Sequence, residues 1–103
     1  MKFYKNLYIG DTITNPGKVK RKLKKYAKLQ NVYVVAYMAE NHQLEIYHSL
    51  MMQQSYYKDN PPCIVGIAGS QEEAVQLVCR IAMEAVDATG SADLIAYLFG
   101  KME

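Results

Sequence analysis

The chain has 103 residues, half of them hydrophobic and 21% charged, with a net charge of +2. This length suits one domain, and the composition excludes a disordered chain, which would be poorer in apolar residues. We therefore expect a single domain over residues 1–103, with a real core and a small margin of stability.

Signals for secretion or membrane insertion are missing from the sequence. No stretch approaches the roughly 18 apolar residues of a membrane span, and the first residues lack the apolar segment and cleavage site of a secretory signal. Cys63 and Cys79 are too few for the disulfide framework of a small secreted domain, so we expect reduced thiols. These features predict a cytoplasmic protein with no membrane span.

The net charge hides an asymmetry along the chain. Residues 1–30 carry nine basic side chains and one acidic one, whereas residues 31–103 carry three basic and nine acidic ones. Asymmetry of this kind indicates an acidic partner, which a second copy of the same dipolar chain would also provide.

The first predicted elements are a strand and a basic helix. Residues 2–9 alternate between the two faces expected of a strand. Asn15 is suited to cap a helix and Pro16 to begin one, which predicts a helix over 16–29. Its apolar side holds Val19, Leu23, Tyr26 and Ala27. The rest of its circumference holds seven basic residues: Lys18, Lys20, Arg21, Lys22, Lys24, Lys25 and Lys28.

The middle of the chain predicts an antiparallel hairpin. Residues 31–39 and 43–52 are rich in Val, Ile and Tyr and are separated by a short polar turn. Residues 53–62 end in two prolines and are expected to form a loop. Residues 63–69 read as a short, fully apolar strand.

The best-marked helix runs from Ser70 to Gly90. Ser70 and Glu73 match the capping-box pattern, and Gly90 is suited to end the helix. The face expected to be buried holds Val75, Val78, Ile81, Ala82, Ala85 and Val86. Residues 92–99 have apolar side chains at helical spacing, with a final strand as the alternative.

This order of elements predicts an α+β fold. One strand, one helix, three strands and two helices suit a mostly antiparallel sheet of about four strands with the helices on one face.

The basic segment is the first candidate site. Its lysines can neutralise phosphates, and the single Arg favours phosphate contact over base reading. The favoured interpretation is a solvated face partly paired with acidic groups, ahead of nucleic acid and of an anionic membrane surface. The candidates for contact with an anion or partner are Lys18, Lys20, Arg21, Lys24, Lys25 and Lys28.

Tyrosines on the predicted strands are the second candidate site. A spacing of four residues puts each pair on one face of its strand. Such faces, if they coincide, could stack nucleobases or form a dimer interface, whereas the plainer interpretation is that tyrosine suits a half-wet strand. These candidates are Tyr4, Tyr8, Tyr33, Tyr37 and Tyr47.

Little in the sequence indicates catalysis. His48 and Cys63 would form a thiol–imidazole pair only if their strands were neighbours, and a partly buried histidine is the favoured interpretation. The histidines and cysteines lack metal-ligand spacing, and we expect no cofactor. An enzyme is therefore the least favoured class.

The sequence thus favours a non-catalytic binding or assembly module. Its expected partner is itself, through a face or edge of the sheet and through contact between the basic helix of one copy and an acidic surface of another. The alternative is a nucleic-acid-binding protein that uses the helix at 16–29 and a tyrosine-rich sheet face.

Overall fold

The computed structural model describes residues 1–29, 31–38, 40 and 42–100. Its centre is a four-stranded sheet in the order β1-β4-β2-β3. The strands are β1 (Lys2–Ile9), β2 (Tyr33–Met38), β3 (Gln43–His48) and β4 (Cys63–Ala68). β1 and β4 are parallel, while β2 runs antiparallel to both β4 and β3, so the sheet is mixed.

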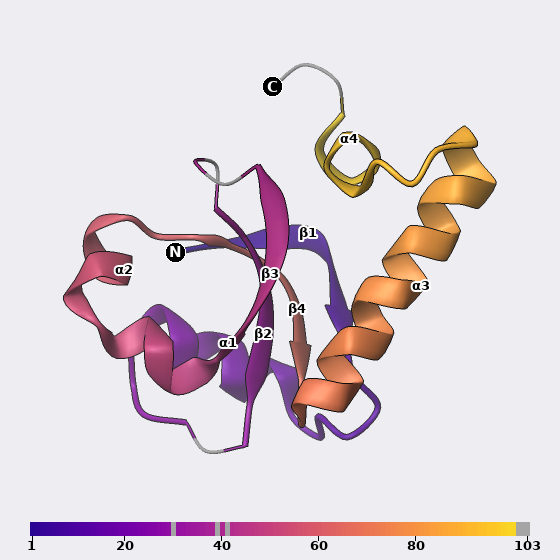
Figure 1. Ribbon diagram of the computed structural model, residues 1–103. Coiled ribbons are helices and arrows are strands. Elements are labelled where there is room, and N and C mark those ends of the chain that lie inside the picture. Colours follow the sequence, from indigo (N-terminus) through magenta and orange to yellow (C-terminus); the bar gives the residue numbers. More distant parts are fainter. Residues whose placement is uncertain (30, 39, 41, 101–103) are drawn as a thin grey trace.

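Helices cover both faces of this sheet. They are α1 (Pro16–Lys24), the 3-10 helix η1 (Ser49–Gln53), α2 (Ser55–Asp59), α3 (Gln71–Thr89) and α4 (Leu94–Phe99). Figure 1 shows α1 and α2 on one side of the sheet and α3 and α4 on the other. The predicted α+β class and four-stranded sheet are confirmed, with helices on two faces where one was expected.

The two central strands explain the second layer of helices. β2 alternates, with Val34 in the cluster beneath α1 and Val35 in the cluster beneath α3. On β4, Ile64 and Val65 divide in the same way, and all four side chains are fully buried. Strands that are apolar on both faces need cover on both faces, which is why β4 reads as a continuous apolar run.

α1 ends at Lys24, whereas the sequence predicts a helix that continues to residue 29. The N–H of Tyr26 donates to the carbonyl of Leu23 at 3.0 Å, and the N–H of Ala27 donates to that of Lys22 at 2.9 Å. These two bonds form a Schellman motif, which requires a left-handed residue just after the helix. Tyr26 supplies it with φ 56°. Because that residue is usually glycine, the sequence gives no local sign of this end.

The segment after the hairpin is more ordered than the sequence predicts. β3 stops at His48, whose Nδ1 accepts the N–H of Leu50 at 3.1 Å and starts η1. α2 follows where a loop was expected, because Tyr57 is buried in the core beneath it. Residues 94–99 form α4, which confirms the helix over the alternative strand.

The ends of α3 are as predicted, but its buried face is rotated. Ser70 Oγ accepts the N–H of Glu73 at 3.0 Å, and Gly90 ends the helix at φ 76°. The fully buried positions are Ala74, Leu77, Ile81 and Ala85. Val75 and Val86 are 46% and 47% exposed, contrary to the prediction. The small side chains of the two alanines let the helix lie close to the sheet, which turns the valines outward.

Candidate functional site

The carboxyl ends of β1 and β4 meet at one edge of the sheet because the two strands are parallel. The loop at residues 10–15, which leads from β1 into α1, lies there beside Gly69, the residue after β4. Ligands in sheets with parallel strands commonly bind at this edge. The surface around this loop is therefore a candidate site.

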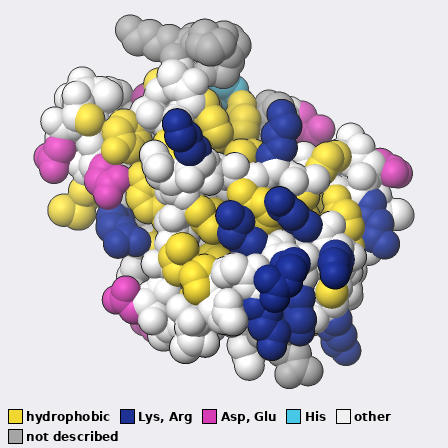
Figure 2. All heavy atoms as spheres, turned by 180° about the vertical axis from the view of Figure 1, so that it is seen from behind, with side chains coloured by type: hydrophobic (Ala, Val, Ile, Leu, Met, Phe, Trp, Pro, Cys, Tyr) yellow, Lys and Arg dark blue, Asp and Glu magenta, His cyan; other side chains and the backbone are white. Residues whose placement is uncertain are grey.

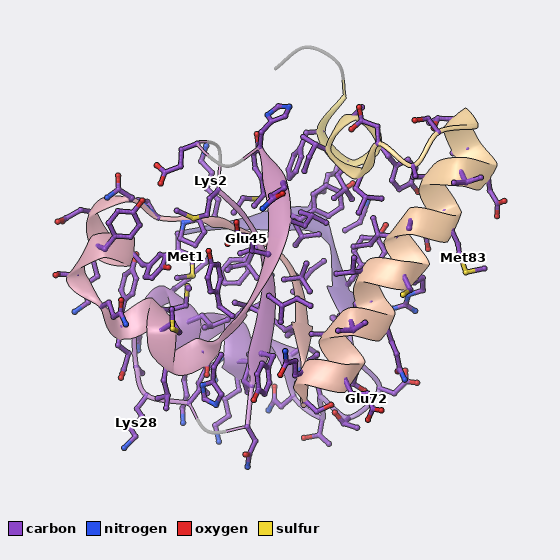
Figure 3. The ribbon with its side chains drawn as sticks, in the orientation of Figure 1. Met1, Lys2, Lys28, Glu45, Glu72 and Met83 are labelled. Carbon is purple, nitrogen blue, oxygen red and sulfur yellow. The ribbon has the colours of Figure 1, made fainter. Side chains whose placement is uncertain are left out.

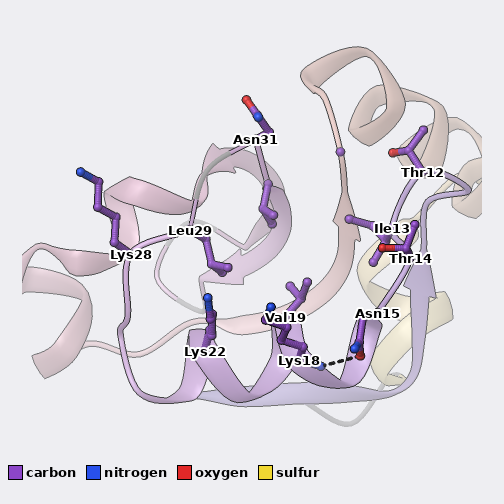
Figure 4. A pocket seen from close by; sticks show the side chains of 12 residues that line it. Thr12, Ile13, Thr14, Asn15, Lys18, Val19, Lys22, Lys28, Leu29 and Asn31 are labelled. Carbon is purple, nitrogen blue, oxygen red and sulfur yellow. Dashed lines mark hydrogen bonds between the residues drawn. The ribbon is translucent and has the colours of Figure 1, made fainter.

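A pocket of about 860 Å³ opens between this loop, α1 and the segment that leads into β2. Figure 4 shows Lys18, Val19 and Lys22 on the side of α1 that borders the pocket, with Lys28 at its rim. Lys28 comes close because the chain reverses after Tyr26 instead of continuing as a helix. We call this concavity the cationic pocket.

The loop wall of the cationic pocket is held by Glu73 at the start of α3. Its carboxylate accepts the hydroxyl of Thr12 at 2.7 Å, the N–H of Thr12 at 3.1 Å and the N–H of Gly69 at 2.8 Å. These donors favour the charged carboxylate and therefore lower the pKa of Glu73, and the N–H of Gly69 has the largest effect. The partly exposed carboxylate of Glu73 thus fixes the loop from the far side of the pocket wall.

Two glycines let the chain segments approach this carboxylate closely. A Cβ atom at Gly10 would lie 2.3 Å from Glu73 Oε1, and one at Gly69 would lie 2.1 Å from Thr12 Oγ1. Any side chain at these positions would displace the groups that hold the loop.

The charge of the cationic pocket comes from Lys18, Lys22 and Lys28. No carboxylate is among the described residues that line it. Within the described ranges, none of these three lysines has a carboxylate within ion-pair distance. Lys18 and Lys22 border the concavity on α1, and Lys28 stands at its rim with its side chain directed outward (Figure 4), so the three uncompensated lysines create a positive potential that attracts anions.

The rest of the lining is mixed in character. Ile13, Val19, Leu29 and Val32 contribute aliphatic walls. Thr14, Asn15 and Asn31 contribute hydroxyl and amide groups. Asn15 Oδ1 accepts the N–H of Lys18 at 3.1 Å and caps α1, as the sequence predicts. The pocket can therefore take a ligand that has both an anionic group and an apolar body.

The other basic residues of the segment lie away from the cationic pocket. Lys20 and Lys24 place their Nζ atoms 5.5 and 5.7 Å from the ring centre of Phe3 on β1. Together with Arg21 they line a separate hollow of about 220 Å³. Lys25 is exposed at the end of α1. Figure 2 shows that Lys and Arg side chains gather on this face of the molecule.

The structure therefore divides the predicted basic candidates into two groups. Lys18 and Lys28 belong to the cationic pocket, while Lys20, Arg21, Lys24 and Lys25 do not. Lys22, which was not among the selected candidates, completes the pocket. Thr14 and Asn31 were not identified either, because only the fold brings these scattered polar residues together.

The tyrosine candidates are divided between the two faces of the sheet. Tyr4, Tyr8, Tyr33 and Tyr37 pack in the layer of α3 and α4, and Tyr47 packs on the opposite face. The ring of Phe99 in α4 lies 4.9 Å from that of Tyr37 and 5.7 Å from that of Tyr4. The rings on the first of these faces pack beneath the C-terminal helices α3 and α4. A role of the tyrosines in base stacking or at an interface stays a prediction.

Tyr8 also makes the main polar contact under α3. Its hydroxyl donates to Glu84 Oε1 at 2.6 Å, and the hydroxyl of Tyr97 donates to the same atom at 3.3 Å. Burial, followed by the hydrogen bond to Glu84, raises the pKa of Tyr8. This half-buried polar link joins β1, α3 and α4.

His48 and Cys63 are not brought together. His48 is paired with Tyr33 in β2, whereas Cys63 is paired with Tyr37. That register separates them by about 13 Å along the strand direction, at about 3.3 Å per residue. Burial raises the pKa of the Cys63 thiol, the opposite of what an activated nucleophile needs.

The described residues offer neither a metal cluster nor a membrane-spanning helix. Among them, no group of three or more His, Cys, Asp or Glu side chains could hold a metal ion. No helix formed by these residues has the length and apolar character needed to cross a bilayer.

Comparison with known proteins gives no relative: no family model matches the chain, and no curated protein or solved structure matches it significantly.

Proposed function

We propose that the protein is a non-catalytic binding module that recognises an anionic partner through the cationic pocket and the basic surface of α1. The observation that carries this proposal is the set of three lysines, Lys18, Lys22 and Lys28, around one concavity without a carboxylate in its described lining. Like charges this close are unfavourable in the free protein, with about 0.2–0.5 kcal/mol for an i,i+4 pair such as Lys18 and Lys22. An anion would remove that cost.

The positive potential extends beyond the pocket, because Lys20, Arg21 and Lys24 lie on the neighbouring surface of α1. A broad positive surface raises the rate of encounter with anions and makes binding depend on salt. The nucleic-acid alternative draws support from the same surface. It draws less from the tyrosines, since four of the five lie beneath α3 and α4.

The test is binding of a labelled single-stranded oligonucleotide, used as a general polyanion, by fluorescence polarisation at two salt concentrations. We expect binding that weakens with salt and is lost in a variant with all six of Lys18, Lys20, Arg21, Lys22, Lys24 and Lys28 changed to Gln. A control variant changes Lys2, Lys5 and Lys58 to Gln and should retain most of the binding. Absence of binding by the native protein at low salt would contradict the proposal.

Self-association is the second candidate function, and the outer face of α3 favours it. Val75, Met83 and Val86 are 46%, 69% and 47% exposed there. Figure 3 shows Met83 directed away from the sheet. Asp87 lines the same shallow hollow as Met83 and Val86, so the basic α1 of a second copy would meet complementary charge.

Light scattering after size exclusion, at low and high salt, tests this second function. We expect a mass above that of the monomer at low salt, and a monomer when Met83 is changed to Glu. Ala88→Glu, at an exposed position elsewhere on α3, is the control for added charge. A native monomer at high micromolar concentration in low salt would rule the function out.

A further inference from the structure

We propose that the cationic pocket is a site for a nucleoside phosphate, with the phosphate at the lysines and the base between the aliphatic walls. This inference rests on the proposed function and names the class of ligand for the same surface. Its basis is the combination of size, charge and apolar lining in one concavity.

The size of the pocket excludes a bare phosphate as a sufficient occupant. Small-molecule sites in proteins measure about 300–1,000 Å³, and this one, at about 860 Å³, lies in the upper part of that range. An inorganic anion would fill a small corner and leave the aliphatic walls facing water. A ligand of nucleotide size covers them.

The kind and number of charges suit phosphate groups. A di- or triphosphate carries about as much negative charge as the three lysines carry positive charge, and the described lining holds no carboxylate to repel it. Lysine binds phosphate as a mobile point charge, without the fixed planar fork of arginine. Lys18 and Lys22 lie on successive turns of α1, so their ammonium groups can converge on one phosphate chain.

The other walls suit a sugar and a base. Ile13 and Val19 come from the loop and from α1, while Leu29 and Val32 come from the segment before β2, so apolar groups arrive from two sides. A flat base held between them would bury apolar surface, which favours binding. Asn31 and Thr14 are exposed beside these walls and offer donors and acceptors to a sugar or a base edge.

A nucleic-acid strand fits this pocket less well than a single nucleotide. Proteins that bind single strands use extended grooves with aromatic rings on which successive bases stack. None of the described residues that line the pocket is aromatic, and the open concavity is bordered by the loop, α1 and the segment before β2. One base held by aliphatic groups, with its phosphates at the lysines, matches this shape.

The experiment is isothermal titration of the full chain with ATP, ADP and AMP at low salt. Inorganic phosphate, ribose 5-phosphate and adenosine are the matched partial ligands. We expect ATP and ADP to bind at least about 10-fold more tightly than any partial ligand, since each partial ligand lacks either the phosphates or the base, and AMP, with a single phosphate, to bind more weakly than ADP. Equal affinity for phosphate and ADP, or no nucleotide binding at millimolar concentration, would overturn the inference.

Two triple variants that each remove three positive charges distinguish binding in the cationic pocket from attraction by the general positive potential of the surface. The pocket triple changes Lys18, Lys22 and Lys28 to Gln, and the outer triple changes Lys20, Arg21 and Lys24 to Gln. We expect the pocket triple to weaken ADP binding by about 10-fold or more, through loss of charge-assisted hydrogen bonds, and the outer triple by about twofold through the diffuse field. Similar losses in both would overturn the inference.

A third variant tests the apolar walls without any change of charge. Val19→Thr keeps the side-chain shape and should weaken ADP binding severalfold while it leaves phosphate binding unchanged. Thermal unfolding of each variant verifies its fold. If the labelled oligonucleotide binds and ADP does not, the nucleotide inference fails and the proposed function stands; if neither binds, both fail.

Discussion

Glu73 holds Thr12 by two hydrogen bonds, one from the hydroxyl at 2.7 Å and one from the backbone N–H at 3.1 Å, across 61 positions of the sequence. The carboxylate occupies a place among backbone N–H groups at the ends of two parallel strands, where an anionic ligand could otherwise bind. The protein thus uses its own anion to shape the loop, and the external anion that we propose would meet the lysines on the other side of it.

Replacement of Glu73 by Gln should lower the free energy of unfolding by about 1 kcal/mol at neutral pH, a value discounted for partial exposure. The two backbone N–H donors bond to different carboxylate oxygens, so the amide keeps an acceptor for one of them and places an NH₂ group opposite the other. Because the folded protein lowers the pKa of Glu73, this stability is present above the unfolded value near 4.3 and is lost as pH falls through the folded pKa.

Urea unfolding of both proteins between neutral and acid pH measures this difference, which should begin to close below the unfolded value near 4.3 and vanish once the pH is below the lowered pKa of folded Glu73. Glu72→Gln is the matched control. Its carboxylate is exposed in the same turn of α3 and feels the same helix dipole, but makes no hydrogen bond recorded among the described residues. A loss of the same size in both variants would assign the effect to the dipole and not to the contact with Thr12.

A methyl group at Gly10 should displace the Glu73 carboxylate, because the new Cβ would lie 2.3 Å from Oε1. We expect Gly10→Ala to cost about 1–3 kcal/mol, as changes that break a hydrogen-bonded network do. The cost should shrink when Glu73 is already Ala, since the clashing atoms are then gone.

Gly17→Ala serves as the control for the glycine change. Its Cβ would meet nothing closer than 3.8 Å, in the first turn of α1, and the substitution should stabilise the protein slightly. Chemical denaturation of the single and double variants gives the coupling. Additive effects of the changes at Gly10 and Glu73 would show that the contact has no role.

The hydrogen bond from Tyr8 to Glu84 should couple β1 to α3 by about 1 kcal/mol in a double-mutant cycle of Tyr8→Phe and Glu84→Gln. Tyr97→Phe is the comparison, with a smaller coupling expected from its longer bond to the same oxygen. The raised pKa of Tyr8 adds a pH signature: its contribution is present below about pH 10 and declines as pH rises further. A coupling near zero would mean that packing alone joins the two elements.

The chain reverses after α1 because Tyr26 adopts a left-handed backbone conformation, with φ 56°. This conformation is strained for a residue with a side chain. Glycine adopts this conformation freely and alanine does not, so Tyr26→Gly should be about 1 kcal/mol more stable than Tyr26→Ala. Both variants lose the ring beneath Lys58 Nζ, which cancels in the comparison.

The order should reverse at Arg21, an exposed position inside α1, where Ala is favoured over Gly by about 1 kcal/mol. Thermal unfolding of the four proteins measures both differences. The same order at the two positions would show that the conformation of Tyr26 is not the cause.

Features with local causes were predictable from the sequence. Asn15 and Ser70 cap their helices, and Gly90 ends α3, because each signal acts within four residues. The hairpin of β2 and β3 was also clear, since alternation and a short turn determine it. The end of α1 was not, because a tyrosine holds the place that glycine usually takes.

The candidate site depended on contacts that no local pattern encodes. The sequence identified the basic segment, but only the fold separates Lys18, Lys22 and Lys28 from the lysines over Phe3. Glu73 was recognised as a helix cap, whereas its bonds to Thr12 depend on the parallel pairing of β1 with β4. Helices on both faces could have been inferred from the alternation in β2, whose two faces are equally apolar.

The strand order has a consequence for the way the protein is made. β1 leaves the ribosome first, yet its sole neighbour among the described strands is β4, which is synthesised last. The hairpin can form early from local contacts, while β1 waits without a partner until β4 inserts between it and β2. A nascent chain stopped before residue 63 would therefore hold a hairpin and an unpaired strand, and the edge that carries the pocket would not yet exist.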